Sequence, residues 1–145
     1  MGSPRGTRRA GPPGRGTTRP GRVVLAPTIA PGKICYIQIP AVDIARSAGF
    51  YETVFGWNIR RRGGGEVAFD DTVGEVSGTW VTGRPPAAET GLVVYVMVES
   101  VADTLEKIRE AGGEVVTPLT PQGEGEAFAT FRDPAGNILG IGQQP

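Results

Sequence analysis

The chain has 145 residues, which suffices for one domain with a substantial hydrophobic core but is short for two ordinary domains. It contains no histidine and one cysteine, Cys35, so histidine-based nucleophile systems, histidine-ligated metals and intrachain disulfides are excluded. We interpret Cys35 as a core residue of a protein in the reducing cytoplasm. The net charge of zero conceals a split: residues 1–33 carry seven basic and no acidic side chains, which leaves 8 basic and 15 acidic residues in 34–145.

Residues 1–32 are rich in glycine, proline and arginine and contain too few apolar residues to form a core. Their one apolar run, Val23–Ala26, is followed at once by Pro27 and is too short for a signal peptide or a membrane span. We therefore expect a flexible basic leader, with contact to nucleic acid as the alternative. The folded domain is predicted to cover residues 33–145.

The domain is predicted to begin with a strand at 35–39 and a helix at 43–56. Alternation along the strand puts its aliphatic side chains on one side and Tyr36 and Gln38 on the other. The helix has a single apolar stripe, which suits the aliphatic side of the strand. The stripe consists of Ile44, Ala48, Tyr51 and Phe55. Asp43 is placed to cap this helix, and Gly56 is placed to end it.

Three further strands are expected to complete a first module at 33–83. Their predicted ranges are 57–62, 66–70 and 74–81, with a glycine turn at 63–65. Asp70–Asp71 resembles a catalytic carboxylate pair, but a solvated turn is the favoured interpretation. Arg60–Arg62 resembles a binding site for an anionic substrate, but an exposed strand end is the favoured interpretation. Residues 84–90 are a predicted linker.

The same order recurs in a second module at 91–143. A strand at 92–98 alternates, Ser100 is placed to cap a helix, and Gly112–Gly113 is placed to end it. The remaining strands are predicted at 114–118, 126–132 and 138–141. Residues 119–125 are interpreted as a loop, and Glu124 and Glu126 there either cover a ligand or are simply solvated. A shift of 57 residues carries Tyr36 onto Val93 and Gly56 onto Gly113, so the chain is a twofold internal repeat.

Two such modules form an α+β fold in which the sheet faces without helices remain unburied. Paired within a chain or between chains, they would line a half-open β-barrel whose hollow is the expected ligand site. The predicted lining is Tyr36, Gln38, Val93, Tyr95, Met97, Ile138 and Gly140, with Trp80, Trp57 and Phe128 at the rim. These side chains offer stacking and dispersion surface, although plain strand packing explains several of them as well.

The pair of segments FYETVFGW (50–57) and FRDPAGNILGI (131–141), inside two βαβββ units, resembles the vicinal oxygen chelate superfamily. That superfamily includes glyoxalase I, extradiol dioxygenases, and fosfomycin and bleomycin resistance proteins. The resemblance covers residues 33–143 and implies the half-open barrel fold. It is specific for the fold and carries little information about function.

The resemblance places the metal ligands of the enzymes at Tyr36, Val93, Gly140 and one position in 77–79. Since these positions lack the usual donors, we expect no metal and no cofactor, and a small-molecule-binding homodimer similar to the bleomycin resistance proteins. The alternative is a metal-dependent lyase, isomerase or dioxygenase that recruits Glu75 or Glu126. The DPAGN turn at 133–137 is given no catalytic role.

Overall fold

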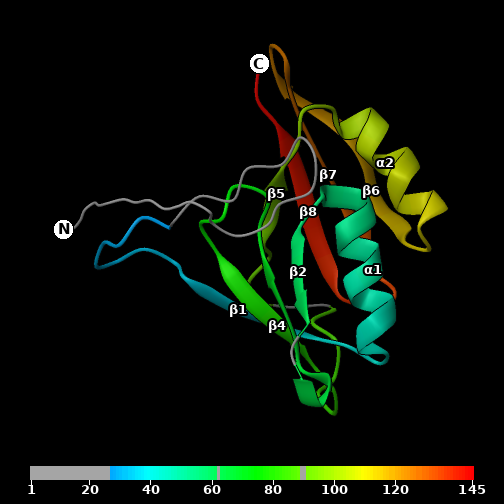
Figure 1. Ribbon diagram of the computed structural model, residues 1–145. Helices are drawn as coiled ribbons and strands as arrows, with labels where there is room; N and C mark the ends of the chain where they lie inside the picture. The colour runs from blue at the N-terminus through cyan, green and yellow to red at the C-terminus, as the bar shows by residue number, and fades with distance from the viewer. Residues whose placement is uncertain (1–26, 62, 89–90) are drawn as a thin grey trace.

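The computed structural model describes residues 27–61, 63–88 and 91–145, so most of the predicted leader lies outside the described residues. The chain forms two βαβββ modules in the predicted order (Figure 1). Module one comprises β1 (Tyr36–Pro40), α1 (Ile44–Phe55), β2 (Asn58–Arg61), the short helix η1 (Gly63–Gly65), β3 (Val67–Asp70) and β4 (Ser77–Val81). Module two comprises β5 (Tyr95–Met97), α2 (Val101–Glu110), β6 (Glu114–Gly123), β7 (Glu126–Arg132) and β8 (Ile138–Gln143).

Each module has one four-stranded mixed sheet, with strand orders β1-β4-β3-β2 and β5-β8-β7-β6. The first strand pairs in parallel with the last, and the other pairs are antiparallel. The two sheets are not closed into a barrel, and the predicted α+β, half-open arrangement is confirmed. β1 and β5 each form an edge of their sheet.

Both helices begin and end where the sequence predicts. The Asp43 carboxylate accepts a hydrogen bond from the backbone N–H of Arg46 at 3.1 Å, and Gly56 ends α1 with φ of 73°. Ser100 caps α2 in the same way, since its Oγ accepts from the N–H of Asp103. The N–H of Gly113 then donates to the carbonyl of Ile108 at 2.8 Å, which satisfies one of the last carbonyls of α2.

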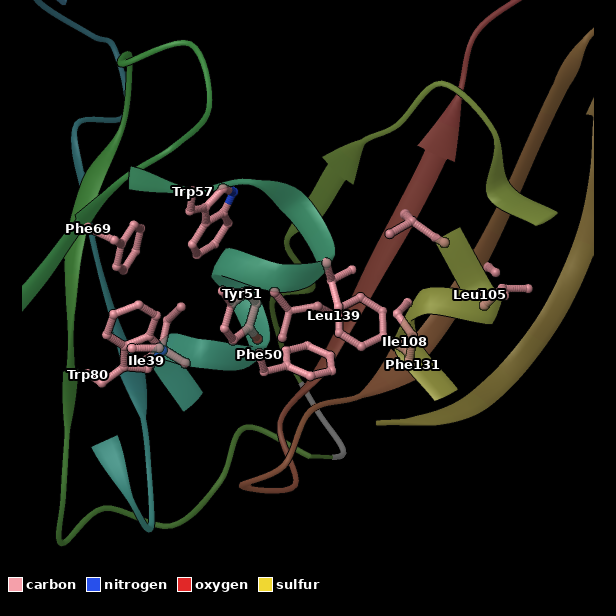
Figure 2. Close-up of a cluster of buried hydrophobic side chains, with 14 of the residues drawn as sticks. Ile39, Phe50, Tyr51, Trp57, Phe69, Trp80, Leu105, Ile108, Phe131 and Leu139 are labelled. Atoms are coloured by element: carbon pink, nitrogen blue, oxygen red, sulfur yellow. The ribbon is translucent and has the colours of Figure 1, made fainter. Parts of the chain in front are cut away.

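One continuous core extends through both modules because α1 packs against the two sheets at once (Figure 2). On one side the ring of Tyr51 stacks on Trp57 with centroids 4.7 Å apart, and it lies 5.9 Å from Trp80 of β4. On the other side Phe50 approaches Phe131 of β7 at 6.0 Å. The helices therefore lie on the inner faces of the sheets, and the opposite, outer faces of the two sheets cannot face each other within one chain.

A buried polar network fastens module one to the β7–β8 turn. The hydroxyl of Tyr51 donates to Oδ2 of Asp133 at 2.8 Å, and Nδ2 of Asn137 donates to the same oxygen at 2.9 Å. Asn137 also donates to the carbonyl of Pro40 and accepts from the N–H of Ala87. The DPAGN turn thus supports the packing of the modules. No helix in the described part of the chain is long and apolar enough to cross a membrane.

Several local predictions are wrong. Cys35 is exposed, because it precedes β1 instead of packing under α1. Residues 119–123 belong to strand β6, which pairs with β7 up to Gly123, so only Glu124 and Gly125 form the connecting turn. The interpretation of 119–125 as a loop is therefore wrong. β5 is also shorter than the predicted strand at 92–98.

Candidate functional site

The outer face of module one is polar. Strand register puts eight side chains on it: Tyr36, Gln38, Asn58, Arg60, Ala68, Asp70, Ser77 and Thr79. At its centre the Asp70 carboxylate accepts hydrogen bonds from Nε and Nη2 of Arg60 at 2.9 and 3.0 Å. Asn58 and Ser77 donate to the same carboxylate at 3.2 and 2.7 Å. The sequence favours a solvated turn for Asp70 and an exposed strand end for Arg60. These two residues instead belong to one ordered network, in which the Asp70 side chain is only 17% exposed.

Partial burial opposes ionisation of Asp70, but the hydrogen bonds from Arg60, Ser77 and Asn58 outweigh it and lower the pKa of the carboxyl below its ordinary value. Strand geometry explains why sequence reasoning missed this cluster. Asn58 pairs with Asp70 and Arg60 with Ala68 across the glycine turn, so the alternation along both strands puts the three polar residues on one face. Working out that hairpin register from the sequence would have revealed it.

The outer face of module two carries two aromatic rings, those of Tyr95 and Phe128. Register puts Tyr95 beside Gly140 and Phe128 beside Gly142, so the two glycines of β8 lie between the two rings. The rings are 6.4 Å apart with an angle of 63° between their planes. A hollow of about 310 Å³ lies over this part of the sheet. Its lining residues are Tyr95, Gln122, Glu126, Ala127, Phe128, Gly142, Gln143 and Gln144.

A larger groove of about 1010 Å³ opens between β1 and β5. Side chains from both faces of these strands line it, together with the end of α1 and Trp57, which follows that helix. Of the predicted lining residues, Gln38, Tyr95, Met97 and Ile138 contribute to this groove. Trp57, which is predicted at the rim, lines it as well, and the other predicted residues lie elsewhere.

Tyr36 and Val93 are about half exposed on the surface, and Trp80 is buried in the core with 3% exposure instead of lying at a rim. Gly140 is covered by a side chain, since a Cβ at this position would overlap the ring of Tyr95. The structure therefore brings part of the predicted lining together: Gln38, Tyr95, Met97, Ile138 and Trp57 line the groove. Tyr36, Val93, Gly140 and Trp80 do not line it.

The family model described as Glyoxalase/Bleomycin resistance protein/Dioxygenase superfamily matches residues 33–141. The chain belongs to this superfamily. The vicinal oxygen chelate resemblance predicted from the sequence is thereby confirmed.

Similar proteins agree with this assignment. CFP32 of Mycobacterium bovis, which carries the name of a candidate glyoxylase, is 25% identical over 115 residues, covering 74% of this chain and 44% of CFP32. This chain thus spans less than half of that relative. A superfamily enzyme from Burkholderia phytofirmans has a TM-score of 0.63 at 17% identity, over 74% of this chain and 95% of its own. The fosfomycin resistance protein FosX of Listeria monocytogenes has a TM-score of 0.62 at 16% identity, over 81% and 96%. At these identities the solved structures show the fold alone.

The superfamily's metal-binding positions do not fit a metal ion in this chain. The register of Tyr95 with Gly140 repeats that of Gln38 with Thr79, which identifies Thr79 as the module-one counterpart of Gly140. The Thr79 hydroxyl donates to the carbonyl of Val67 at 2.7 Å, and Gly140 has no side chain and lies under an aromatic ring. Within residues 27–61, 63–88 and 91–145, no three His, Cys, Asp or Glu side chains gather as a possible metal site.

Glu75, the carboxylate considered for an alternative metal site, is engaged by the segment that precedes β1. Its two oxygens accept from the N–H and hydroxyl of Thr28, and Nζ of Lys33 lies 2.9 Å from Oε1. The hydrogen bond from Lys33, with those from Thr28, lowers the pKa of Glu75 below its ordinary value. The Glu75 carboxylate therefore holds the segment that precedes β1 in place.

Proposed function

We propose that this superfamily member binds a small organic molecule without a metal ion and does not transform it. The observation that carries the proposal is the ring of Tyr95 lying on Gly140. A position that presents a metal ligand in the enzymes is occupied here by aromatic surface. Aromatic rings and the Met97 thioether bind by stacking and dispersion, which require no metal.

We further propose that the binding site is completed by a second copy of the chain. The outer faces point away from each other within one chain, since α1 packs between the sheets. Each face is bordered by an open edge strand, β1 or β5, and large apolar side chains there are exposed, with Met97 at 74%. Open edges and clustered apolar surface are typical of protein interfaces. A homodimer that pairs the outer face of module one with that of module two would enclose a ligand between them.

The two faces differ in chemistry, and this difference indicates the character of the ligand. Module one supplies hydrogen-bonding groups such as Gln38 and Ser77, whereas module two supplies the Tyr95 and Phe128 rings. We therefore expect a molecule with one flat apolar part and one polar part. The Listeria neighbour is named as a fosfomycin resistance protein, so antibiotics belong among the candidates.

A thermal-shift screen tests the proposal. The purified protein is dialysed against EDTA and heated with a panel of antibiotics and aromatic metabolites, each with and without added Zn²⁺, Ni²⁺ or Mn²⁺. A ligand that binds only the folded state at a hundred times its Kd stabilises the protein by about 2.7 kcal/mol, which is a clear shift in Tm. We expect hits that do not change on chelation. Tyr95→Ala should abolish them, and Val42→Ala, at an exposed position outside the groove and the hollow, should not.

Two results would overturn the proposal. One is a hit that requires stoichiometric metal, or a Tm that rises with a metal alone, because either result would favour a metal-dependent enzyme. The other is a complete absence of shifts over the whole panel. Light scattering of the same sample measures the mass, and a monomer at all concentrations would contradict the shared site while leaving binding to a single face to be judged by the screen.

A further inference from the structure

The hollow on the outer face of module two has the chemistry to select one class of ligand. Building on the proposed binding function, we infer that it takes flat aromatic molecules that carry a positive charge. The inference depends on three features of the hollow: its glycine floor, its aromatic walls and its single carboxylate.

The floor is the bare backbone of Gly142, which lines the hollow beside Phe128 of β7. The neighbouring Gly140 lies under the ring of Tyr95 of β5. The rings lie edge to face at 6.4 Å and 63°, too close for a third ring to enter between them. A flat molecule would instead lie over the exposed parts of this pair. The half-exposed Tyr95 presents its ring surface for such stacking.

The charge of the hollow is negative. Glu126 is the only acidic residue in its lining, and no lining residue is basic. Its carboxylate lies beside Gly123, the residue of β6 that pairs with Glu126 of β7. A Cβ placed on Gly123 would be 2.8 Å from Oε1 of Glu126. In the described part of the chain the ion pairs involve other acids, namely Glu75, Asp70, Glu106 and Glu114. The Glu126 carboxylate is therefore available to form an ion pair with a ligand.

Aromatic faces and a carboxylate act together on a flat cation. The ring faces attract positive charge through their quadrupole, and the carboxylate attracts it directly. The part of the chain that contains the hollow, residues 34–145, is net negative as well, since it carries 8 basic and 15 acidic side chains. An anion finds no matching group in this hollow. The guanidinium of Arg60 lies on the other module and already binds Asp70.

The polar rim of the hollow is partly fixed in place. Oε1 of Gln143 accepts from the N–H of Val101 at 2.7 Å, so this side chain connects β8 to the start of α2. Gln122 and Gln144 add amide groups that suit the ring nitrogens and amino groups of a heteroaromatic cation. Charge, stacking surface and amide groups thus favour the same chemical class.

Three tricyclic probes of nearly equal shape test the inference by fluorescence titration at about pH 7.5: 9-aminoacridine as the cation, acridine as the neutral molecule and anthracene-9-carboxylate as the anion. We expect the cation to bind about tenfold more tightly than the other two. Glu126→Gln should remove that preference, and Phe128→Ala should weaken binding of all three. Glu124→Gln is the matched control, since it removes a carboxylate from the same hairpin at a residue that does not line the hollow.

The outcomes separate this inference from the proposed function. Equal affinity for the three probes, or a preference that survives Glu126→Gln in a variant with unchanged Tm, would refute the charge selection while binding itself stands. If none of the probes binds but the thermal-shift panel gives hits, the stacking site is wrong and the binding function is retained. If the panel gives no hits either, both fail.

Discussion

The contact between Tyr51 and Asp133 connects α1 to the turn of module two, and its removal gives a sharp test of how the modules hold together. Tyr51→Phe deletes the hydroxyl that donates to Oδ2 of Asp133 at 2.8 Å. The ring remains, and with it the stacking on Trp57 at 4.7 Å. The substitution therefore isolates one buried hydrogen bond without leaving a large cavity.

The expected cost follows from what Asp133 retains. Its Oδ2 still accepts from Nδ2 of Asn137 at 2.9 Å, so the carboxylate is not left without a partner. A hydrogen bond to a charged group contributes about 1.5–3 kcal/mol, and we expect a loss in this range at pH 7. For a chain of this length the melting temperature should fall by about 5–10 °C. Tyr36→Phe, at a half-exposed tyrosine, is the control and should change stability little.

The same pair predicts a dependence on alkaline pH. Burial, and then the neighbouring Asp133, raises the pKa of Tyr51 well above its ordinary value near 10. Above pH 10 the unfolded chain loses this proton and the folded chain keeps it, so the stability of the wild type falls as pH rises. The Tyr51→Phe variant lacks this pH-dependent contribution to the unfolding free energy. The difference in unfolding free energy between wild type and variant should therefore shrink by about 1.4 kcal/mol between pH 9 and pH 11.

Urea denaturation at pH 7, 9 and 11 measures these differences. Equal stability of the two proteins at pH 7 would show that the hydrogen bond contributes nothing. A difference that stays constant up to pH 11 would show that Tyr51 ionises as easily in the folded state as in the unfolded chain. The first result would refute the hydrogen-bond argument, and the second would refute the burial argument.

Two further substitutions compare glycines on the last strand of each module. Gly78→Ala should destabilise by about 3 kcal/mol or more in thermal unfolding, since its Cβ would overlap backbone and the buried ring of Phe69. Gly140→Ala should cost less than about 1 kcal/mol, because the overlapping Tyr95 ring is half exposed and can move; equal losses would refute this distinction. Asp70→Asn should cost about 1–2 kcal/mol at pH 7, and because the folded carboxyl has a lowered pKa, this difference should narrow as pH falls below about 4. Urea unfolding at pH 7 and 3 measures it, and a difference that widens in acid would contradict the network.

The sequence predicts the modules well because their signals are local. Asp43 and Gly56 each act on their own helix end, and the shift of 57 residues that relates them to the second module needs no knowledge of tertiary contacts. The order of elements along the chain in the second module follows from the same repeat. These features depend on residues a few positions apart, which is where helix capping and alternation are informative.

The site is predicted less well because it depends on how the modules pack. Alternation correctly puts Tyr36 and Ile37 on opposite faces of β1. It does not reveal that α1 packs on both sheets, so that the outer faces of the two sheets point away from each other. The position of Trp80 in the core follows from its contacts with Tyr51 and Phe69, at long sequence separations. Such contacts carry no local signature.

The repeat also explains how one fold can build an asymmetric site. Gln38 with Thr79 and Tyr95 with Gly140 occupy equivalent positions, yet one pair is polar and the other places a ring over bare backbone. In the proposed homodimer, pairing of unlike modules gives two identical cavities, each with one polar and one aromatic wall. Pairing of like modules would put the two polar walls in one cavity and the two aromatic walls in the other. Only the first arrangement can hold both ends of an amphipathic molecule, so a stoichiometry of two ligands per dimer follows from the divergence of the two modules.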